Sequence, residues 1–420
     1  MSDLTNQTDT LFLKWNTNHT PGCLLAIIQD GDILYQQGYG LADLENTIPI
    51  SPESVFYIAS TSKQFTAASI LLLAHKGRLS LDDDICLHIR EMPLYNTAIT
   101  IRHLIHHTSG LRDSLTLLDL AGINVTEAIY NNADLLKLVA RQENLNFPPG
   151  EQYKYCNAGY LLLAEIVARV SGKTLRQFAH DNIFAPLNMH HTHFDDHHRE
   201  HIPNRVMSYH PHDNGYKAYP KNFDIVGSGG LLTTSGDLAL WDQNFYIPKI
   251  GDTNFINTLY TPGSLNSGES LTYAFGLQVG DYKGLRVIHH AGGMLGFRTN
   301  LYRFPNQNFS VICLSNSADI DASQICCRVA DLYLADQFRL DSFTGNYHST
   351  ELDVIYTLEN QNGDLIITSP ATFDEPLRSQ GNDKFQSGNK TIQFLRNHQN
   401  TIIGFDIKTD RVFNVHFVKT

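Results

Sequence analysis

Residues 56–67 read FYIASTSKQFTA and place a serine, Ser60, three positions before a lysine, Lys63. From Ser60 onward apolar residues recur at helical spacing and Gly77 can end the run, which predicts a helix beginning at Ser60. Residues three apart share one face of a helix. The pair is therefore either a helix cap followed by a solvated lysine, or a nucleophile beside its proton acceptor.

The sequence on both sides of this helix predicts one antiparallel sheet. Two apolar runs in residues 23–39 flank Asp30-Gly31, which indicates a hairpin. Later strand-like segments are 271–280, 285–292, 297–304 and 309–316, and the clearest later helices are 157–172 and 322–338. Strands at both ends of a helical middle favour an α+β arrangement, a sheet with a helical insertion.

The pattern of apolar and polar residues changes after residue 340. Short alternating segments are separated there by turn signals: Asn362-Gly363-Asp364, Gly381-Asn382-Asp383 and Ser387-Gly388-Asn389. Such spacing is typical of a small barrel or sandwich. We therefore expect two domains, residues 1–338 with the mixed fold and residues 340–420 with an all-β, barrel-like or lipocalin-like fold.

Composition excludes some classes of partner. The 420 residues carry a formal net charge of −12, which argues against binding nucleic acid. No apolar run reaches the roughly 20 residues of a membrane span. The first residues lack the pattern of a secretory signal, so we expect a cytoplasmic location, or a periplasmic or secreted one if a leader has been removed. Six irregularly spaced cysteines are expected to be reduced.

A second short motif follows the loop FPPGEQ at 147–152. Tyr155 and Asn157 place a phenol and a carboxamide just before the helix expected at 157–172. The phenol can relay a proton if a cation such as Lys63 lowers its pKa, and the amide can bind a substrate amide or hold the lysine. The alternative is a half-buried tyrosine and an asparagine at a helix entry.

A third motif, HHAGGM at 289–294, lies at the end of an expected strand. Gly292 and Gly293 would let a substrate approach the backbone closely, as an edge strand beside a cleft requires. The alternative is a plain turn at the end of a strand. A bare Ser-x-x-Lys is weak evidence, since Ser387 and Lys390 repeat it in a Gly/Asn turn that is expected to be structural.

Taken in order, the three motifs S-x-x-K, Y-x-N and H-x-G resemble those of the penicillin-recognising serine hydrolases, the class C β-lactamase and D-alanyl-D-alanine peptidase family. Other stretches are similar to this family too, among them ITIRHLIHHTSGL (99–111) and GSGGLLTTSGDLALW (227–241). The resemblance covers most of residues 20–338. It implies the β-lactamase/transpeptidase-like fold, a serine hydrolase activity and no cofactor.

The resemblance also implies roles for the residues. Ser60 would be the acylated nucleophile, Lys63 would take its proton directly or through Tyr155, and Tyr155 would donate to the leaving group. Lys63 can do so only if desolvation and nearby positive charge lower its pKa. The backbone N–H groups of Ser60 and Gly293 would form the oxyanion hole. Water would then hydrolyse the acyl-enzyme.

One position departs from the β-lactamase pattern. His290 stands where that pattern has a lysine, and imidazole is a weaker, pH-dependent partner for a substrate carboxylate. We therefore expect a peptidase or amidase for peptides containing D-residues, with a carboxylesterase as the alternative and weak β-lactamase activity disfavoured. A non-catalytic, ligand-sensing penicillin-binding-like protein is the alternative outside catalysis. The partners expected are a short peptide, ester or other small substrate, and the resemblance leaves a homo-oligomer open.

The histidine-rich segment HHTHFDDHHREH (190–201) could bind a divalent metal, because imidazole and carboxylate are good ligands. Its first half resembles a family loop in which histidines are not ligands. We therefore expect a surface loop and no metal site. His103, His106 and His107 are likewise expected to pack and hydrogen-bond at a helix end.

Overall fold

The computed structural model describes residues 2–124, 129–335, 338, 340–361, 364–370, 372–381, 383–397 and 401–420. The chain forms two compact units. The first comprises residues 1–279, 288–303 and 308–329, and the second comprises 280–287, 304–307 and 330–420. The division into domains 1–338 and 340–420 stays a prediction. Within the described ranges, no helix combines the length and apolar character needed to cross a membrane.

A six-stranded sheet joins strands from both ends of the first part of the chain. Its order is β10-β11-β12-β13-β1-β2. The strands are β1 (Cys23–Gln29), β2 (Asp32–Tyr39), β10 (Gln278–Tyr282), β11 (Leu285–Met294), β12 (Phe297–Phe304) and β13 (Phe309–Ser315). The β1–β2, β1–β13 and β11–β12 pairs are antiparallel. Asp30 (φ 54°) and Gly31 (φ 89°) make the left-handed turn of the first hairpin, as predicted.

One predicted strand is mostly wrong. Of residues 271–280, only the part from Gln278 onward lies in a strand. Gly276 has a φ of 69° and turns the chain tightly against the backbone of Lys63, where a Cβ would meet main-chain atoms at about 2.5 Å. The apolar side chains of 273–277 are buried in the helical core instead. The apolar pattern of residues 273–277 therefore reflects burial against a helix, although it resembles that of a strand.

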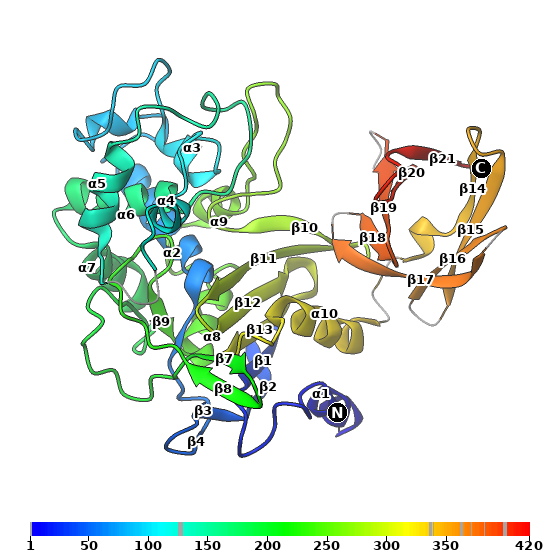
Figure 1. Ribbon diagram of the computed structural model, residues 1–420, viewed down its shortest axis with the longest axis horizontal. Helices are drawn as coiled ribbons and strands as arrows, with labels where there is room; N and C mark the ends of the chain where they lie inside the picture. Colours follow the sequence, from blue (N-terminus) through cyan, green and yellow to red (C-terminus); the bar gives the residue numbers. More distant parts are fainter. Residues whose placement is uncertain are drawn as a thin grey trace. The chain divides into compact units, whose positions relative to one another are not determined.

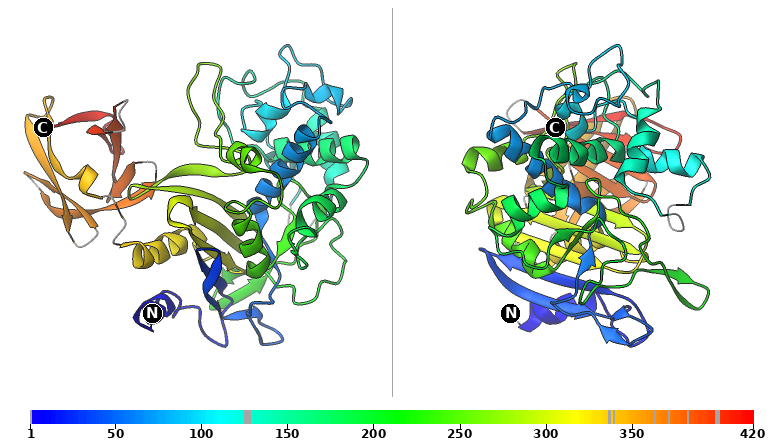
Figure 2. Two further views of the ribbon diagram at one scale, coloured as in Figure 1. Left: turned by 180° about the vertical axis from the view of Figure 1, so that it is seen from behind. Right: turned by 90° about the vertical axis from the view of Figure 1, so that its left-hand side faces the viewer.

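Ten α-helices are found among the described residues: α1 (Ser2–Thr10), α2 (Lys63–His75), α3 (Ile101–Ile105), α4 (Ser114–Leu120), α5 (Asn132–Ala140), α6 (Asn157–Ser171), α7 (Leu175–Ala179), α8 (Ser235–Gln243), α9 (Thr253–Leu259) and α10 (Ala322–Tyr333). Figures 1 and 2 show α2 to α7 gathered beside the sheet. Short two- and three-stranded pieces complete this part: β3 (Leu41–Asp43) with β4 (Ile48–Pro49), β5 (Phe56–Tyr57) with β9 (Leu231–Thr233) and β6 (His193–Phe194), and β7 (Tyr209–His212) with β8 (Gly215–Ala218).

Helices α8 and α10 cover opposite faces of the sheet. Leu314 of β13 belongs to the same buried cluster as Trp241 of α8. The Sγ atom of Cys326, on α10, lies 3.8 Å from the carbonyl oxygen of Val311 in β13. Side chains alternate along a strand, and Cys313 and Cys326 interact on the face away from Leu314. The predicted sheet with a helical insertion is thus confirmed.

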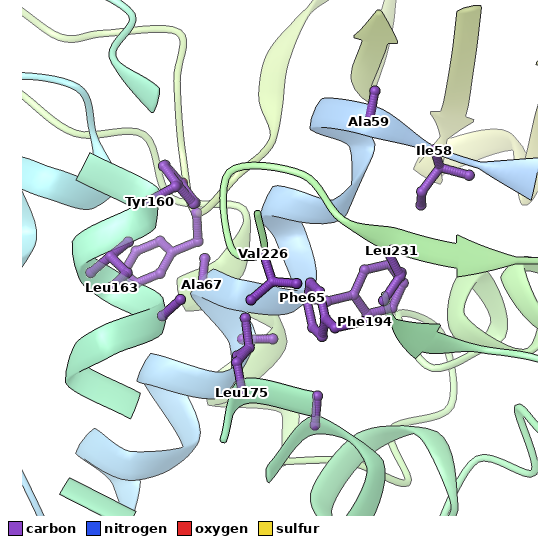
Figure 3. Close-up of a cluster of buried hydrophobic side chains, with 14 of the residues drawn as sticks. Ile58, Ala59, Phe65, Ala67, Tyr160, Leu163, Leu175, Phe194, Val226 and Leu231 are labelled. Atoms are coloured by element: carbon purple, nitrogen blue, oxygen red, sulfur yellow. The ribbon is translucent and has the colours of Figure 1, made fainter. Parts of the chain in front are cut away.

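Helix α2 runs through the middle of the apolar core. Every residue from Lys63 to Leu73 is buried, and Gly77 (φ 63°) follows its end as predicted. Figure 3 shows Phe65 and Ala67 of α2 packed with Tyr160 and Leu163 of α6 and with the β9 region. A helix that is apolar on all sides must be buried on all sides. This burial is what removes water from Lys63.

The second unit contains a closed barrel of eight strands. They are β14 (Gly345–Ser349), β15 (Val354–Gln361), β16 (Asp364–Ser369), β17 (Thr372–Gly381), β18 (Lys384–Ser387), β19 (Lys390–Arg396), β20 (Ile402–Lys408) and β21 (Val415–Lys419). Phenylalanine side chains fill its core, among them Phe394, Phe405 and Phe417. The predicted all-β fold is confirmed. Gly388 (φ 54°) turns β18 into β19, whereas Asn362, Gly363 and Asn382 of the other predicted turns lie outside the described residues.

Candidate active site

Ser60 lies in a tight 3₁₀ turn, Ala59–Ser62, directly before α2. It is therefore not the cap of the helix, which begins at Lys63 and is preceded by Ser62. Ala59 adopts a left-handed φ of 48°, an uncommon conformation for alanine that is found at functional turns. The Thr61 hydroxyl donates to the carbonyl oxygen of His290, which ties the turn to β11. The turn leaves Ser60 half-buried and on the wall of a pocket.

The amine of Lys63 is held by three acceptors. Its Nζ lies 3.1 Å from Ser60 Oγ and 3.0 Å from Asn157 Oδ1, and it also donates to the backbone carbonyl of Ser228. Three acceptors match the three hydrogens of an ammonium group. The same side chain is fully buried. The lysine is thus aimed at the serine and shielded from solvent.

Burial lowers the pKa of Lys63 from its ordinary 10.5 to about 7. The charge of Asp113 and the thiol of Cys156 act in the opposite direction and raise it. The expectation that nearby positive charge lowers this pKa is wrong, because desolvation alone does so. At neutral pH a substantial fraction of Lys63 is unprotonated and can accept the hydrogen of Ser60.

Asp113 fixes the orientation of Asn157. The backbone N–H of Asn157 donates to Asp113 Oδ2 at 2.6 Å, and the side-chain Nδ2 donates to the same oxygen at 3.0 Å. Since the amide nitrogen faces Asp113, the amide oxygen faces Lys63. The other carboxylate oxygen of Asp113 caps α4 through Leu115 and Thr116. Sequence reasoning missed Asp113, whose available signal was an aspartate just before a helix.

Tyr155 lies over the same lysine. Lys63 Nζ is 4.9 Å from the centroid of the Tyr155 ring. Burial raises the pKa of the Tyr155 phenol well above its ordinary value of 10, although a hydrogen bond to Ser60 opposes the rise. The condition for a proton relay, that a cation such as Lys63 lowers this pKa, is therefore not met, because desolvation dominates. The phenol stays protonated at neutral pH and is suited to donating a hydrogen.

His290 is buried and neutral. Its Nδ1 donates to the carbonyl oxygen of Ala291 at 2.6 Å, and its Nε2 accepts from the Tyr273 hydroxyl at 2.9 Å. Burial, together with the nearby Lys63, lowers the pKa of His290 to about 3. The pairing of His290 with a substrate carboxylate stays a prediction; in this structure the low pKa leaves the ring neutral at neutral pH, and both of its nitrogens are bonded within the chain.

The two glycines have different surroundings. A Cβ on Gly292 would lie 2.2 Å from the carbonyl oxygen of Ile58 and 2.4 Å from Thr299 Oγ1, so the strand passes too close to the serine turn for any side chain. A Cβ on Gly293 would meet nothing closer than 3.8 Å, and Gly293 lines the pocket with Ser60. Gly293 thus lines the same pocket as Ser60, and Gly292 allows the strand to come close to the serine turn.

The pocket at Ser60 is largely apolar. Its volume is about 70 Å³, and its lining comprises Tyr57, Ala59, Ser60, Leu115, Asn157, Phe223, Ile225, Ser228, Gly229, Gly293 and Met294. No Asp, Glu, Lys, Arg or His is part of this lining among the described residues. The structure therefore brings Ser60, Lys63, Tyr155, Asn157 and Gly293 together, whereas His290 is not part of the pocket lining and its ring lies 6.3 Å from that of Tyr155.

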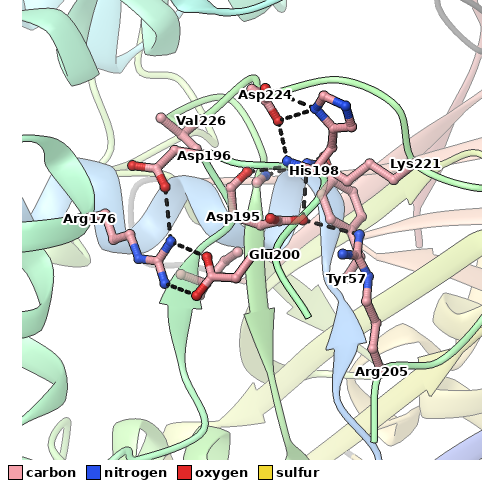
Figure 4. A network of polar contacts seen from close by, with 12 residues as sticks. Tyr57, Arg176, Asp195, Asp196, His198, Glu200, Arg205, Lys221, Asp224 and Val226 are labelled. Atoms are coloured by element: carbon pink, nitrogen blue, oxygen red, sulfur yellow. Dashed lines mark hydrogen bonds and ion pairs between the residues drawn. The ribbon is translucent and has the colours of Figure 1, made fainter. Parts of the chain in front are cut away.

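The histidine-rich segment 190–201 takes part in a network that supports this wall (Figure 4). Asp195 pairs with Lys221 at 3.0 Å and with Arg205 at 3.1 Å, while His198 hydrogen-bonds Asp224. Lys221 Nζ lies 5.0 Å from the ring centroid of Phe223, which lines the pocket. Over the described parts of the chain, no three His, Cys, Asp or Glu side chains are grouped to hold a metal ion.

His103, His106 and His107 make packing and hydrogen-bond contacts, as predicted. The His103 side chain closes a capping box with Thr100, and His106 Nδ1 hydrogen-bonds the Tyr273 carbonyl at 3.1 Å. His107 Nδ1 accepts from the Cys156 N–H, and its ring lies 4.3 Å from that of Tyr155. His107 thus forms part of the apolar support behind the phenol.

Known proteins share this fold and sequence. The sequence model of the beta-lactamase family matches residues 9–328. Penicillin-binding protein 4* of Bacillus subtilis (strain 168) is 31% identical over 348 residues, covering 78% of this chain and 75% of that protein. A D-aminopeptidase of Brucella anthropi is 26% identical over 353 residues, which cover 81% of this chain but only 66% of the relative. The chain thus spans slightly less than two thirds of that enzyme.

A solved structure extends the likeness to the second unit. The octameric penicillin-binding protein homologue from Pyrococcus abyssi superposes with a TM-score of 0.69 and 22% identity, covering 99% of this chain and 100% of that one. At this identity the likeness concerns the fold. The family match covers more than half of the chain and includes every residue that meets at the pocket. The chain belongs to the beta-lactamase family and is a serine hydrolase of the β-lactamase and transpeptidase type.

Proposed function

We propose that this enzyme hydrolyses amide bonds in short peptides that contain D-residues, through an acyl-enzyme on Ser60. The observation that carries the proposal is the 3.1 Å contact between Ser60 Oγ and the desolvated amine of Lys63. The similarity to a D-aminopeptidase supports the kind of reaction. An amide leaves only if its nitrogen is protonated, and the buried phenol of Tyr155 is a suitable acid.

The proposed reaction balances within these residues. Ser60 Oγ bonds to the carbonyl carbon while its hydrogen moves to the neutral Lys63 amine. The N–H groups of Ser60 and Gly293 stabilise the oxyanion, and one such donor contributes roughly 3 kcal/mol. The carbon–nitrogen bond then breaks as Tyr155 gives its hydrogen to the leaving amine. The phenolate regains a hydrogen from the Lys63 ammonium, and water hydrolyses the ester at Ser60.

A carboxylesterase is the second candidate. The pocket lining has no charged side chain among the described residues and includes Leu115, Phe223, Ile225 and Met294, which suits an uncharged acyl chain. An alkoxide leaving group also needs less help from an acid than an amine does. Strong β-lactamase activity is disfavoured, because the third motif supplies the neutral imidazole of His290 and no cation.

Parallel rates on four substrates test the proposal. These are the p-nitroanilides of D-alanine and L-alanine, p-nitrophenyl butyrate, and nitrocefin, each measured with the wild type and with Ser60→Ala. We expect Ser60-dependent turnover with the D-anilide favoured over the L-anilide. Ser60-dependent turnover of the butyrate alone would replace the peptidase with the esterase. Turnover that persists in Ser60→Ala would contradict both.

We also propose that the barrel shapes the substrate range or builds an oligomer. The support is that an octameric homologue has the same fold over nearly the whole chain. Deleting residues 340–420 should change either the ratio of rates on short and long substrates or the mass in solution. Unchanged kinetics and mass would remove both roles.

A further inference from the structure

Tyr155 lies outside every regular element of the fold. Residues 152–156 belong to neither a helix nor a strand, and α6 begins only at Asn157. The hydrogen-bond ladder of a helix therefore does not fix the position of this tyrosine. The proposed reaction nevertheless needs the phenol within hydrogen-bond reach of the leaving nitrogen. The contacts that Tyr155 and its two chain neighbours make must supply this precision.

The residues on both sides of Tyr155 are hydrogen-bonded to His107. The Lys154 N–H donates to the His107 carbonyl oxygen at 2.9 Å, and the Cys156 N–H donates to His107 Nδ1 at 3.1 Å. The first bond uses the main chain of His107 and is open to any residue type, whereas the second needs an acceptor on the side chain. A single residue thus holds the chain before and after the tyrosine.

The His107 ring also packs against the phenol ring. The two ring centroids are 4.3 Å apart, and the ring planes are inclined by 39°. The His107 ring is itself enclosed by Tyr273 and Tyr160, whose ring centroids lie 4.5 and 5.2 Å from its own. Only 1% of His107 is exposed, so this ring has little room to move. The histidine therefore restrains both the backbone of Tyr155 and the tilt of its ring.

Two features make a histidine costly at this position. Its φ is 57°, just after the end of α3, where glycine or asparagine is usual. Its Nε2 is buried and has no hydrogen-bond partner among the described residues, which costs about 1–3 kcal/mol. A phenylalanine would fill the same space without the unsatisfied nitrogen, but it could not accept from the Cys156 N–H. The Nδ1 contact is thus what distinguishes histidine from an apolar ring here.

We infer that His107 is a positioning residue, which keeps the hydroxyl of Tyr155 aimed at the leaving group through two hydrogen bonds to the flanking residues and through its ring. The inference rests on the proposed reaction, in which Tyr155 is the acid. A displacement of about 1 Å can slow a reaction about 100-fold. Loss of His107 should therefore slow the reactions whose leaving group needs a proton, and it should spare those whose leaving group departs as a stable anion.

Two variants separate the hydrogen bond from the ring. His107→Phe keeps a ring and loses the acceptor, whereas His107→Asn keeps an acceptor, tolerates the left-handed φ and loses the ring. The readout is the ratio of kcat/KM for D-alanine p-nitroanilide to that for p-nitrophenyl butyrate, whose phenolate leaves without an acid. We expect this ratio to fall about 10- to 100-fold in His107→Phe and by less in His107→Asn. Partial unfolding cancels, because the ratio is taken within one variant.

A double-mutant cycle shows whether His107 acts through Tyr155. In Tyr155→Phe there is no phenol to position, so adding His107→Phe should leave the ratio of rates unchanged. The matched control is His106→Asn, a change at the neighbouring buried histidine, whose Nδ1 bonds the Tyr273 carbonyl and whose ring packs against Phe275. This control should keep the wild-type ratio. An unchanged ratio in both His107 variants, or an equal fall with and without the phenol, would overturn the inference.

A spectroscopic readout separates this inference from the proposed function. In enzyme labelled with fluorotyrosine, the fluorine NMR signal of Tyr155 is identified by its loss in Tyr155→Phe. This signal should shift in both His107 variants and stay in place in His106→Asn. If the wild type hydrolyses no amide, the proposed function fails, and the signal still decides whether His107 holds the phenol. A Tyr155 signal at the same position in the wild type and in both His107 variants would reject the inference alone.

Discussion

The amine nitrogen of Lys63 lies 3.1 Å from the hydroxyl oxygen of Ser60, on a side chain that is fully buried. Proximity alone would not make this lysine a base, because an ammonium group has no lone pair to offer. Burial changes this by lowering the pKa of Lys63 to about 7. The same burial raises the pKa of Tyr155. The same apolar surroundings thus suit the two groups to the opposite roles that the proposed reaction gives them, the Lys63 amine as base and the Tyr155 phenol as acid.

The first prediction concerns the pH dependence of catalysis. In the proposed reaction the active form of the free enzyme has an unprotonated Lys63, so kcat/KM should rise about tenfold per pH unit below pH 7 and level off above it. No alkaline decline from Tyr155 is expected up to pH 9, since burial raises its pKa. Rates on a neutral substrate between pH 5 and 9 measure this. If kcat/KM instead continued to rise towards pH 10, Lys63 would have kept its ordinary pKa.

The second prediction concerns Asp113. Its charge raises the pKa of Lys63, so Asp113→Asn should move the acid limb of kcat/KM to lower pH. An asparagine oxygen can still accept from Asn157, and we expect the plateau rate to fall by about tenfold at most. Asp252→Asn is the matched control, because Asp252 also caps a helix, α9, through Phe255. If the acid limb of kcat/KM stayed at the same pH in Asp113→Asn, the Asp113 carboxylate would not raise the pKa of Lys63.

The third prediction concerns stability. Between pH 7 and 10.5 the unfolded chain binds a proton at Lys63 that the folded chain does not, so this residue makes the free energy of unfolding rise with pH across that range. Lys63→Met should remove the rise and stabilise the enzyme at pH 7 by on the order of a few kcal/mol, while abolishing activity. The measurement is the free energy of unfolding by denaturant, determined at pH 7 and pH 9 for the wild type and for Lys63→Met.

The control for this experiment is Lys137→Met, because Lys137 lies on α5 with 69% of its side chain exposed. This variant should show the wild-type dependence on pH. If Lys63→Met and Lys137→Met behave alike, the desolvation of Lys63 has no measurable cost.

The fourth prediction compares the two glycines. Gly292→Ala places a Cβ 2.2 Å from the carbonyl oxygen of Ile58, so the strand or the serine turn must shift, at a cost of about 1–3 kcal/mol in stability. Gly293→Ala has room and keeps the backbone N–H, so it should fold with a near wild-type Tm. Thermal melts of both variants measure the difference. Equal losses would refute the close approach of β11 to Ile58.

The sequence predicts those parts of the site that are close in the chain. Ser60 and Lys63 are one helical turn apart, and Tyr155 and Asn157 are two residues apart, so local geometry fixes each pair. The hairpin at Asp30 and the end of α2 at Gly77 were predictable for the same reason, since they depend on local backbone conformation.

Long-range features were not predictable in this way. Asp113 reaches Asn157 across 44 positions, and the Ser228 acceptor is a backbone carbonyl, which leaves no trace in the residue type. The pKa directions of Tyr155 and His290 depend on burial by many neighbours that no motif contains. The false strand at 271–277 arose because burial against a helix can mimic alternation.

The central claim is that Ser60 becomes nucleophilic through the neutral amine of Lys63. The most direct measurement is mass spectrometry of the enzyme after treatment with a fluorophosphonate, with the labelling rate followed from pH 5 to 9. The account predicts a single adduct on Ser60, absent in Ser60→Ala, whose rate of formation rises with pH to a plateau above about pH 7 and collapses in Lys63→Met. An adduct on another residue, or labelling of Ser60 that is unaffected by Lys63→Met, would contradict it.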